Sequence, residues 1–168
     1  MLAQNVAIAR PDLVRAMVLA GCPGAIPATL REAILRRGTD AEAGGMSSVV
    51  DGTLQRWFSE AFMSTEGVHP VRHRLLQNAP SNYAATWEAV AEHDALPHLG
   101  AIALPTLVVA GARDQATSLD AKKALAAAIP GSRLQIFTEA PHMMQIENET
   151  EFTSAVTEFL DSIGERHG

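Results

Sequence analysis

Largely apolar segments near both ends of the chain predict three β-strands. Val14–Ala20 and Thr106–Ala110 are short runs rich in β-favouring apolar residues, which is the pattern of strands covered on both faces. Arg133–Phe137 has the composition of a third strand. Gly21 and Gly111 follow the first two runs directly, and we expect each glycine to end its strand.

Apolar residues at helical spacing predict the elements between and after these strands. A first helix covers residues 1–9 and ends before Pro11, because proline disfavours helical geometry in the residue before it. Leu119–Ala128 and about Glu149–Gly164 are the other two helices of this part, and alternating strands and helices with short links favour a parallel sheet. The last helix has a predicted buried stripe of Val156, Phe159, Leu160 and Ile163.

The middle of the chain, residues 25–98, has no strand pattern and holds every Trp and Tyr. We interpret it as a helical cap inserted into an α/β core made of residues 1–24 and 99–168. We expect Ser47 or Ser48 to cap its second helix. The predicted elements are a helix over Pro27–Arg37 that ends at Gly38, a polar loop over Thr39–Gly45, a helix over Ser48–Phe62, a short helix after Pro70 and a helix from near Ser81.

Composition and charge narrow the possible functions. The chain has 168 residues, which is one domain by length, and its 47% hydrophobic content is that of a globular protein. The net charge of −6 and the lack of a basic cluster argue against nucleic acid or an anionic membrane as a partner. One cysteine excludes an internal disulfide, and neither a signal peptide nor a membrane span is evident. We therefore expect a cytoplasmic protein.

Two polar side chains follow neighbouring predicted strands and form the candidate chemistry. Asp114 comes three residues after Gly111, and His142 follows the third strand in Thr-Glu-Ala-Pro-His. Ligands gather at the carboxyl ends of parallel strands, so we expect Asp114 and His142 at the same edge of the sheet. An acid followed by a histidine supplies two members of a Ser-His-Asp triad, in which Asp114 orients the ring of His142 and His142 moves the proton.

Six stretches carry a resemblance to a known family: Arg10–Gly21, Arg56–Phe58, Tyr83–Asp94, Leu104–Asp114, Ile129–Ser132 and Pro141-His142. Together they resemble the C-terminal portion of the α/β-hydrolase fold, and most closely its 3-oxoadipate enol-lactonase-like branch. The resemblance implies a partial α/β-hydrolase fold with about three parallel strands, flanking helices and an inserted helical cap. It also implies a serine hydrolase of small-molecule esters or lactones that needs no cofactor, with triad positions at Asp114 and His142.

The nucleophile that this family uses does not occur in these 168 residues. The family places its serine in a Gly-x-Ser-x-Gly elbow one strand before the helix that residues 1–9 resemble, and no such motif is present. The strand and loop that would supply part of the oxyanion hole are expected upstream as well. We therefore expect a fragment, a split-gene product or a chain that starts at an internal Met, and we expect it to be inactive alone.

Aromatic residues of the predicted cap are candidates for substrate binding. Trp57, Phe58 and Trp87 could line an apolar pocket, Trp57 being the favoured residue, although packing within the cap is the alternative. Cys22 follows a strand, but Pro23-Gly24 does not allow the strand-turn-helix elbow of a nucleophile.

His69 and His73 have the spacing of two metal ligands on one helix face. Pro70 between them fits only a first helical turn, and no third ligand is nearby, so no metal is expected.

A second class of function is open. The strand Val14–Ala20 is expected to have one edge without a partner in this chain, and an apolar edge invites pairing with another strand. The chain would then be a non-catalytic truncated protein or an association module. Its partner would be a second copy or a complementing N-terminal fragment.

Overall fold

The computed structural model describes residues 1–164, in two compact units. The first unit joins Met1–Gly24 to the chain from Ala95 onward, and the second is Ala25–Asp94. Residues 165–168, which the sequence analysis assigns to the core, lie outside the described part. None of the described helices is both long and apolar enough to cross a bilayer.

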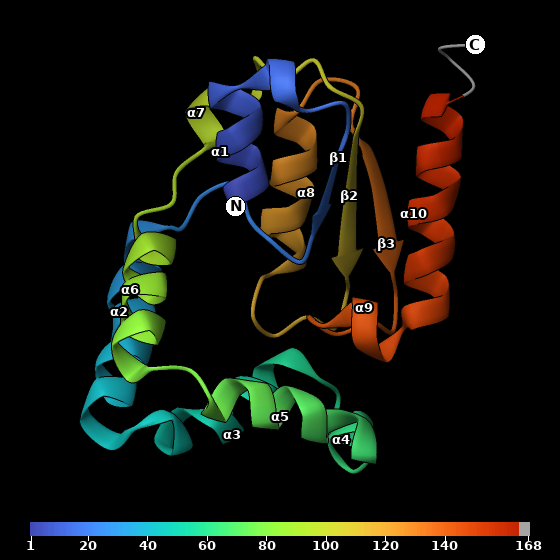
Figure 1. The fold of residues 1–168 in the computed structure, drawn as a ribbon. Coiled ribbons are helices and arrows are strands. Elements are labelled where there is room, and N and C mark those ends of the chain that lie inside the picture. The colour runs from blue at the N-terminus through green and yellow to red at the C-terminus, as the bar shows by residue number, and fades with distance from the viewer. Residues whose placement is uncertain (165–168) are drawn as a thin grey trace. The chain divides into compact units, whose positions relative to one another are not determined.

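A three-stranded parallel sheet is the centre of the first unit (Figure 1). The strands are β1 (Met17–Ala20), β2 (Thr106–Gly111) and β3 (Arg133–Phe137), in the order β1-β2-β3. In the register of the sheet, Val109 of β2 pairs with Ala20 of β1 and with Gln135 of β3. All six residues of β2 are buried, which explains why this strand is apolar without alternation.

Helices cover both faces of this sheet (Figure 1). Val108 points to one face, where it packs with residues of three helices, and Leu107 and Val109 point to the other. The predicted parallel α/β architecture is therefore confirmed. The first face is covered by α1 (Leu2–Ala9), α7 (Leu96–Leu99) and α8 (Leu119–Ala128), and the second by α9 (Met144–Glu147) and α10 (Glu149–Gly164).

Two predictions for this unit are wrong in detail. Residues 14–16 were expected in the first strand, but Val14 closes a 3-10 turn over Pro11–Leu13. Pairing starts only where the Met17 N–H donates to Pro105 O, at 2.9 Å. On α10, Leu160 is 51% exposed instead of buried, because Phe152, Ala155, Phe159 and Ile163 form the face that packs on the sheet.

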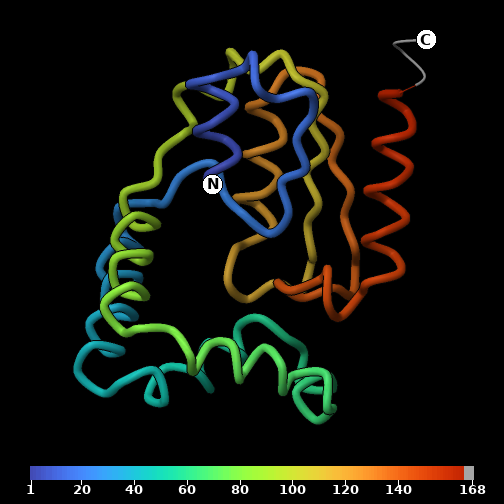
Figure 2. Tube along the Cα trace, in the orientation of Figure 1, coloured from blue at the N-terminus to red at the C-terminus, as the bar shows by residue number. Residues whose placement is uncertain are grey.

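The second unit is helical, and its two ends meet. An antiparallel bridge joins Ala25 to Asp94, and the Ile26 N–H donates to His93 O at 2.9 Å. Figure 2 shows α2 and α6 side by side, and these two helices pack along much of their lengths. The helices are α2 (Ala28–Gly44), α3 (Met46–Trp57), α4 (Glu60–Met63), α5 (His69–Leu76) and α6 (Pro80–Ala91).

The sequence predicted that the first helix of this unit ends at Gly38 and that Thr39–Gly45 is a loop. Both predictions are wrong. α2 continues to Gly44. Gly38 is buried against α6, and a Cβ at this position would lie 2.8 Å from the Cα of Ala84. The glycine therefore permits a close approach of two helices instead of ending one of them.

The next helix also differs from the prediction at both ends. α3 begins at Met46 after Gly45, whose φ is +73°, and neither Ser47 nor Ser48 caps it. The Ser48 hydroxyl donates instead to Gly45 O at 2.7 Å. The helix ends at Trp57, and Ser59 starts α4 by accepting the Phe62 N–H at 3.1 Å, so Phe58 lies in an extended link.

The close contact at Gly38 predicts the effect of a matched pair of substitutions. Gly38→Ala should lower the free energy of unfolding, because overpacking against Ala84 costs about 1–3 kcal/mol and exceeds the ~0.5–1 kcal/mol that alanine gains over glycine inside a helix. Gly52→Ala in α3 should raise it by up to ~1 kcal/mol, since its Cβ would meet only the Arg56 side chain, at 3.5 Å. Urea unfolding of both variants decides this, and equal stabilities would contradict the packing argument.

Candidate active site

The loops after β2 and β3 are held against each other at the carboxyl end of the sheet (Figure 2). The Arg113 N–H donates to Ala140 O at 3.0 Å. A Cβ at Gly111 would overlap the carbonyl oxygens of Ala140 and Pro141. Glycine is thus required where the two loops touch, and this contact places the residues that follow, Asp114 and His142, side by side.

Asp114 and His142 form a hydrogen-bonded pair. His142 Nδ1 lies 3.0 Å from Asp114 Oδ2. The Asp114 side chain is fully buried, whereas that of His142 is 23% exposed. An ionised carboxylate only accepts hydrogen bonds, so it places the ring proton on Nδ1 and makes Nε2 the basic nitrogen. The arrangement can therefore take a proton from a group at Nε2 and stabilise the imidazolium that results.

The other interactions of Asp114 fix its orientation. Oδ1 accepts the backbone N–H groups of Ala116 and Thr117, at 2.7 and 2.9 Å. Oδ2 accepts from Lys122 Nζ at 2.7 Å as well as from His142. Each oxygen thus has two donors, and the carboxylate is held in one plane.

Lys122 is a residue of this cluster that the sequence analysis did not single out. Its side chain is fully buried, and its Nζ donates to Gly111 O at 3.0 Å in addition to Asp114. A signal was present in the sequence, because Lys122 lies three and four residues before Leu125 and Ala126 on the buried face of α8. A lysine on an apolar helix face needs a buried acceptor.

Burial and hydrogen bonding act in opposite directions on the Asp114 carboxyl. Desolvation raises its pKa, and the hydrogen bonds from His142, Lys122 and the Thr117 N–H, together with the His142 charge, lower it. The lowering effects prevail, so the pKa of Asp114 lies below its usual value. Asp114 is therefore a carboxylate at neutral pH.

Gly21 brings the end of β1 to the same site. Its φ of +62° is left-handed, and a Cβ at Gly21 would lie 3.2 Å from His142 Nδ1. A side chain there would be strained and would press on the imidazole ring. The ends of all three strands thus meet at the Asp114–His142 pair.

The aromatic residues proposed for substrate binding belong to the helical unit. Trp57 is half-buried at the end of α3, and Phe58 is buried and stacks on Phe62 with ring centroids 4.7 Å apart. Trp87 packs its edge against Tyr83, and the Arg37 guanidinium lies 4.6 Å from its ring centroid. The Trp87 Nε1 is buried and has no hydrogen-bond acceptor within the part of the chain that the structure describes.

The remaining candidate ligands are engaged locally. His69 Nδ1 lies 2.9 Å from Glu66, and His73 Nε2 lies 2.9 Å from the Gln77 amide. Cys22 is half-buried, and its Sγ lies 3.5 Å from Gln4 Nε2. Among residues 1–164, no three His, Cys, Asp or Glu side chains gather as metal ligands would.

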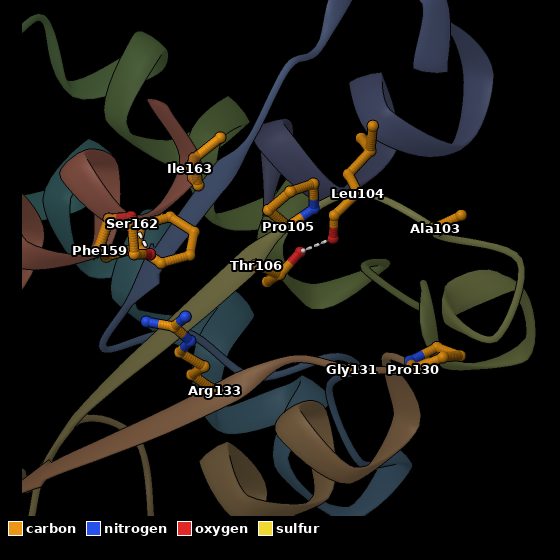
Figure 3. Close-up of a pocket in the computed structure, with 10 residues that line it drawn as sticks. All are labelled: Ala103, Leu104, Pro105, Thr106, Pro130, Gly131, Arg133, Phe159, Ser162 and Ile163. Carbon is orange, nitrogen blue, oxygen red and sulfur yellow. Dashed lines mark hydrogen bonds between the residues drawn. The ribbon is translucent and has the colours of Figure 1, made fainter. Parts of the chain in front are cut away.

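A pocket of about 210 Å³ lies at the opposite end of the sheet, among residues at or before the starts of β2 and β3 and residues of α10 (Figure 3). Its polar side chains have partners within the fold. The Thr106 hydroxyl donates to Leu104 O at 3.0 Å, and Arg133 lies over the ring of Phe159. This pocket is therefore separate from the Asp114–His142 pair.

Known proteins share this fold and parts of this sequence. A family model described as alpha/beta hydrolase fold matches residues 1–149. The 3-oxoadipate enol-lactonase 2 of Acinetobacter baylyi is 35% identical over 114 residues, which are 67% of this chain and 42% of that protein. A pimeloyl-(acyl-carrier protein) methyl ester esterase of Chromobacterium violaceum is 27% identical over 169 residues, 96% of this chain and 66% of that protein.

A solved structure agrees with these sequence matches. The crystal structure of the enol-lactonase from Burkholderia xenovorans superposes with a TM-score of 0.88 at 28% identity, over 94% of this chain and 60% of that one. The chain thus spans less than half of the Acinetobacter enol-lactonase and more than half of the crystallised one. With the model match over residues 1–149, these likenesses show that the chain belongs to the α/β-hydrolase fold family.

Proposed function

We propose that this chain supplies the acid and the base of a triad that hydrolyses esters or lactones. The observation that carries the proposal is the 3.0 Å contact between His142 Nδ1 and the buried, ionised Asp114. The contact lies at the carboxyl ends of parallel strands, where α/β proteins bind their ligands. Esters and lactones are favoured as substrates because relatives are named as an enol-lactonase and a methyl ester esterase.

In the proposed reaction, His142 acts twice. Its Nε2 takes the proton of a serine hydroxyl as the serine oxygen attacks the carbonyl carbon, and later gives that proton to the leaving oxygen. Asp114 stays ionised and stabilises the imidazolium between these steps. The nucleophile would come from outside these 168 residues, since no Gly-x-Ser-x-Gly occurs within them.

The rest of the proposal concerns the substrate-binding residues and the location of the protein in the cell. We propose Trp57, Phe58 and Trp87 as substrate-binding residues of a helical cap, Trp57 being the favoured one. The unpartnered, buried Nε1 of Trp87 supports a polar contact there, because an unsatisfied buried donor is costly. A cytoplasmic location is supported by the single, unpaired Cys22.

The 168-residue chain alone should not hydrolyse an activated ester at enzyme-like rates, because loss of a serine nucleophile costs on the order of 10⁶ in kcat. The measurement is the release of p-nitrophenol from p-nitrophenyl acetate, and the His142→Ala variant is the comparison. Equal background rates of the two proteins are expected. Turnover that disappears in His142→Ala would show that a nucleophile lies within this chain.

In a protein that joins this chain to a serine elbow, Asp114→Asn should lower kcat by up to about 10⁴-fold, because the amide no longer enforces the tautomer of His142. Asp120→Asn, at the exposed start of α8, is the matched control and should leave kcat within about twofold of the unsubstituted protein. Unchanged kcat in Asp114→Asn would show that Asp114 is not the triad acid.

A second candidate function, association through β1, is favoured by the position of this strand. Within the described residues β1 pairs only with β2. Two apolar side chains of the same unit, Leu2 in α1 and Leu13 in the 3-10 turn before β1, are 82% and 65% exposed. A second copy or a complementing fragment could add a strand at this edge.

Light scattering at tens of micromolar, roughly the range where exposed strand edges associate, should detect dimers or larger species. The Met17 N–H donates to Pro105 O, directly before β2, and the Gly21 N–H donates to Val109 O of β2. Strand alternation therefore turns the N–H of Val18 away from β2. Val18→Pro should therefore favour the monomer, since proline is tolerated where the N–H faces away from the sheet. A monomeric unsubstituted chain would contradict association.

A further inference from the structure

We propose that Lys122 is a positioning residue of the candidate triad, which holds Asp114 ionised and in the one orientation that His142 requires. This inference rests on the proposed function, because it concerns the same acid and base. Lys122 contacts no reacting group in the proposed mechanism. It acts through the carboxylate of Asp114, to which its Nζ donates at 2.7 Å.

The burial of Lys122 is the first argument. Its side chain is fully buried, and an ammonium group is rarely taken out of water unless it is paired. The partners of its Nζ are Asp114 Oδ2 and the carbonyl oxygen of Gly111. Lys123, the next residue on α8, is exposed. The fold therefore distinguishes Lys122 from an ordinary surface lysine.

The geometry at Oδ2 is the second argument. Lys122 Nζ and His142 Nδ1 donate to the same oxygen, at 2.7 and 3.0 Å. Oδ1 is already bound by the N–H groups of Ala116 and Thr117. The carboxylate cannot rotate without breaking a bond to Lys122, so the lysine fixes Oδ2 where His142 meets it.

The charges around the pair agree with this role. Among the described residues, the titratable or charged side chains that hydrogen-bond to Asp114 are His142, from the loop after β3, and Lys122, from α8. At neighbouring positions in the two loops, Arg113 and Glu139 form an exposed ion pair with each other. Within the described residues, Lys122 is thus the buried cation that balances the buried carboxylate.

Carboxyl titration by ¹³C NMR tests the proposal on the 168-residue chain. Lys122→Met should raise the pKa of Asp114 by about one unit or more, since a neighbouring cation lowers a carboxyl pKa by roughly 1–3 units. Lys123→Met is the matched control, because it removes the exposed lysine of the same helix turn and leaves Lys122 in place. It should move the pKa of Asp114 by less than about 0.3 unit.

An unchanged Asp114 titration in a folded Lys122→Met would overturn the proposal. If that variant does not fold, the unsubstituted chain decides. The ¹⁵Nζ signal of Lys122 should change at the same pH at which Asp114 titrates, and its failure to do so would refute the coupling.

The proposed function fails separately from this inference. One outcome is that Asp114→Asn leaves hydrolysis unaffected while Lys122→Met changes the Asp114 titration. In that case Lys122 positions a carboxylate that is not the triad acid. If hydrolysis depends on Asp114 but the Asp114 titration is unchanged in Lys122→Met, the proposed function is supported and the role of Lys122 is refuted.

Discussion

The ionised carboxylate of Asp114, removed from water at the end of the central strand, is the constraint on which this end of the fold depends. A buried charge without partners is unstable, and removing one partner from such a pair costs about 3–5 kcal/mol. Four donors from three segments satisfy it: two N–H groups of its own loop, Lys122 of α8, and His142 of the loop after β3. The two loops and α8 are therefore fixed together by one side chain.

Much of the core could be predicted from the sequence because local and tertiary preferences agree there. β3, α8 and α10 have the predicted bounds, and β2 is longer by Gly111 alone. The helical unit was predicted less well, since its errors lie where tertiary contacts override local preferences. Gly38 resembles a helix end in sequence, yet close packing on Ala84 of α6 keeps it inside α2. Propensity alone does not detect such an approach.

The candidate site also has one part that the sequence predicts and one part that only tertiary contacts decide. Chain order and the strand pattern were sufficient to predict that Asp114 and His142 lie at one sheet edge, where the structure places them in contact. Lys122 was overlooked because a lysine in an amphipathic helix is usually solvated. The spacing from Leu125 and Ala126 places it on the buried face, but its acceptor is Asp114, which lies in a separate loop. Only the tertiary structure joins the two.

The lysine has an electrostatic cost for the proposed chemistry as well as a benefit. Because Lys122 already neutralises the Asp114 carboxylate, an imidazolium at His142 is stabilised less than it would be beside an unshared carboxylate. The benefit is a carboxylate that remains ionised and does not rotate, and so keeps the proton of His142 on Nδ1. We therefore expect the proposed triad to depend on the fixed geometry of this carboxylate, and the close approach of Gly21 to the ring adds to that rigidity.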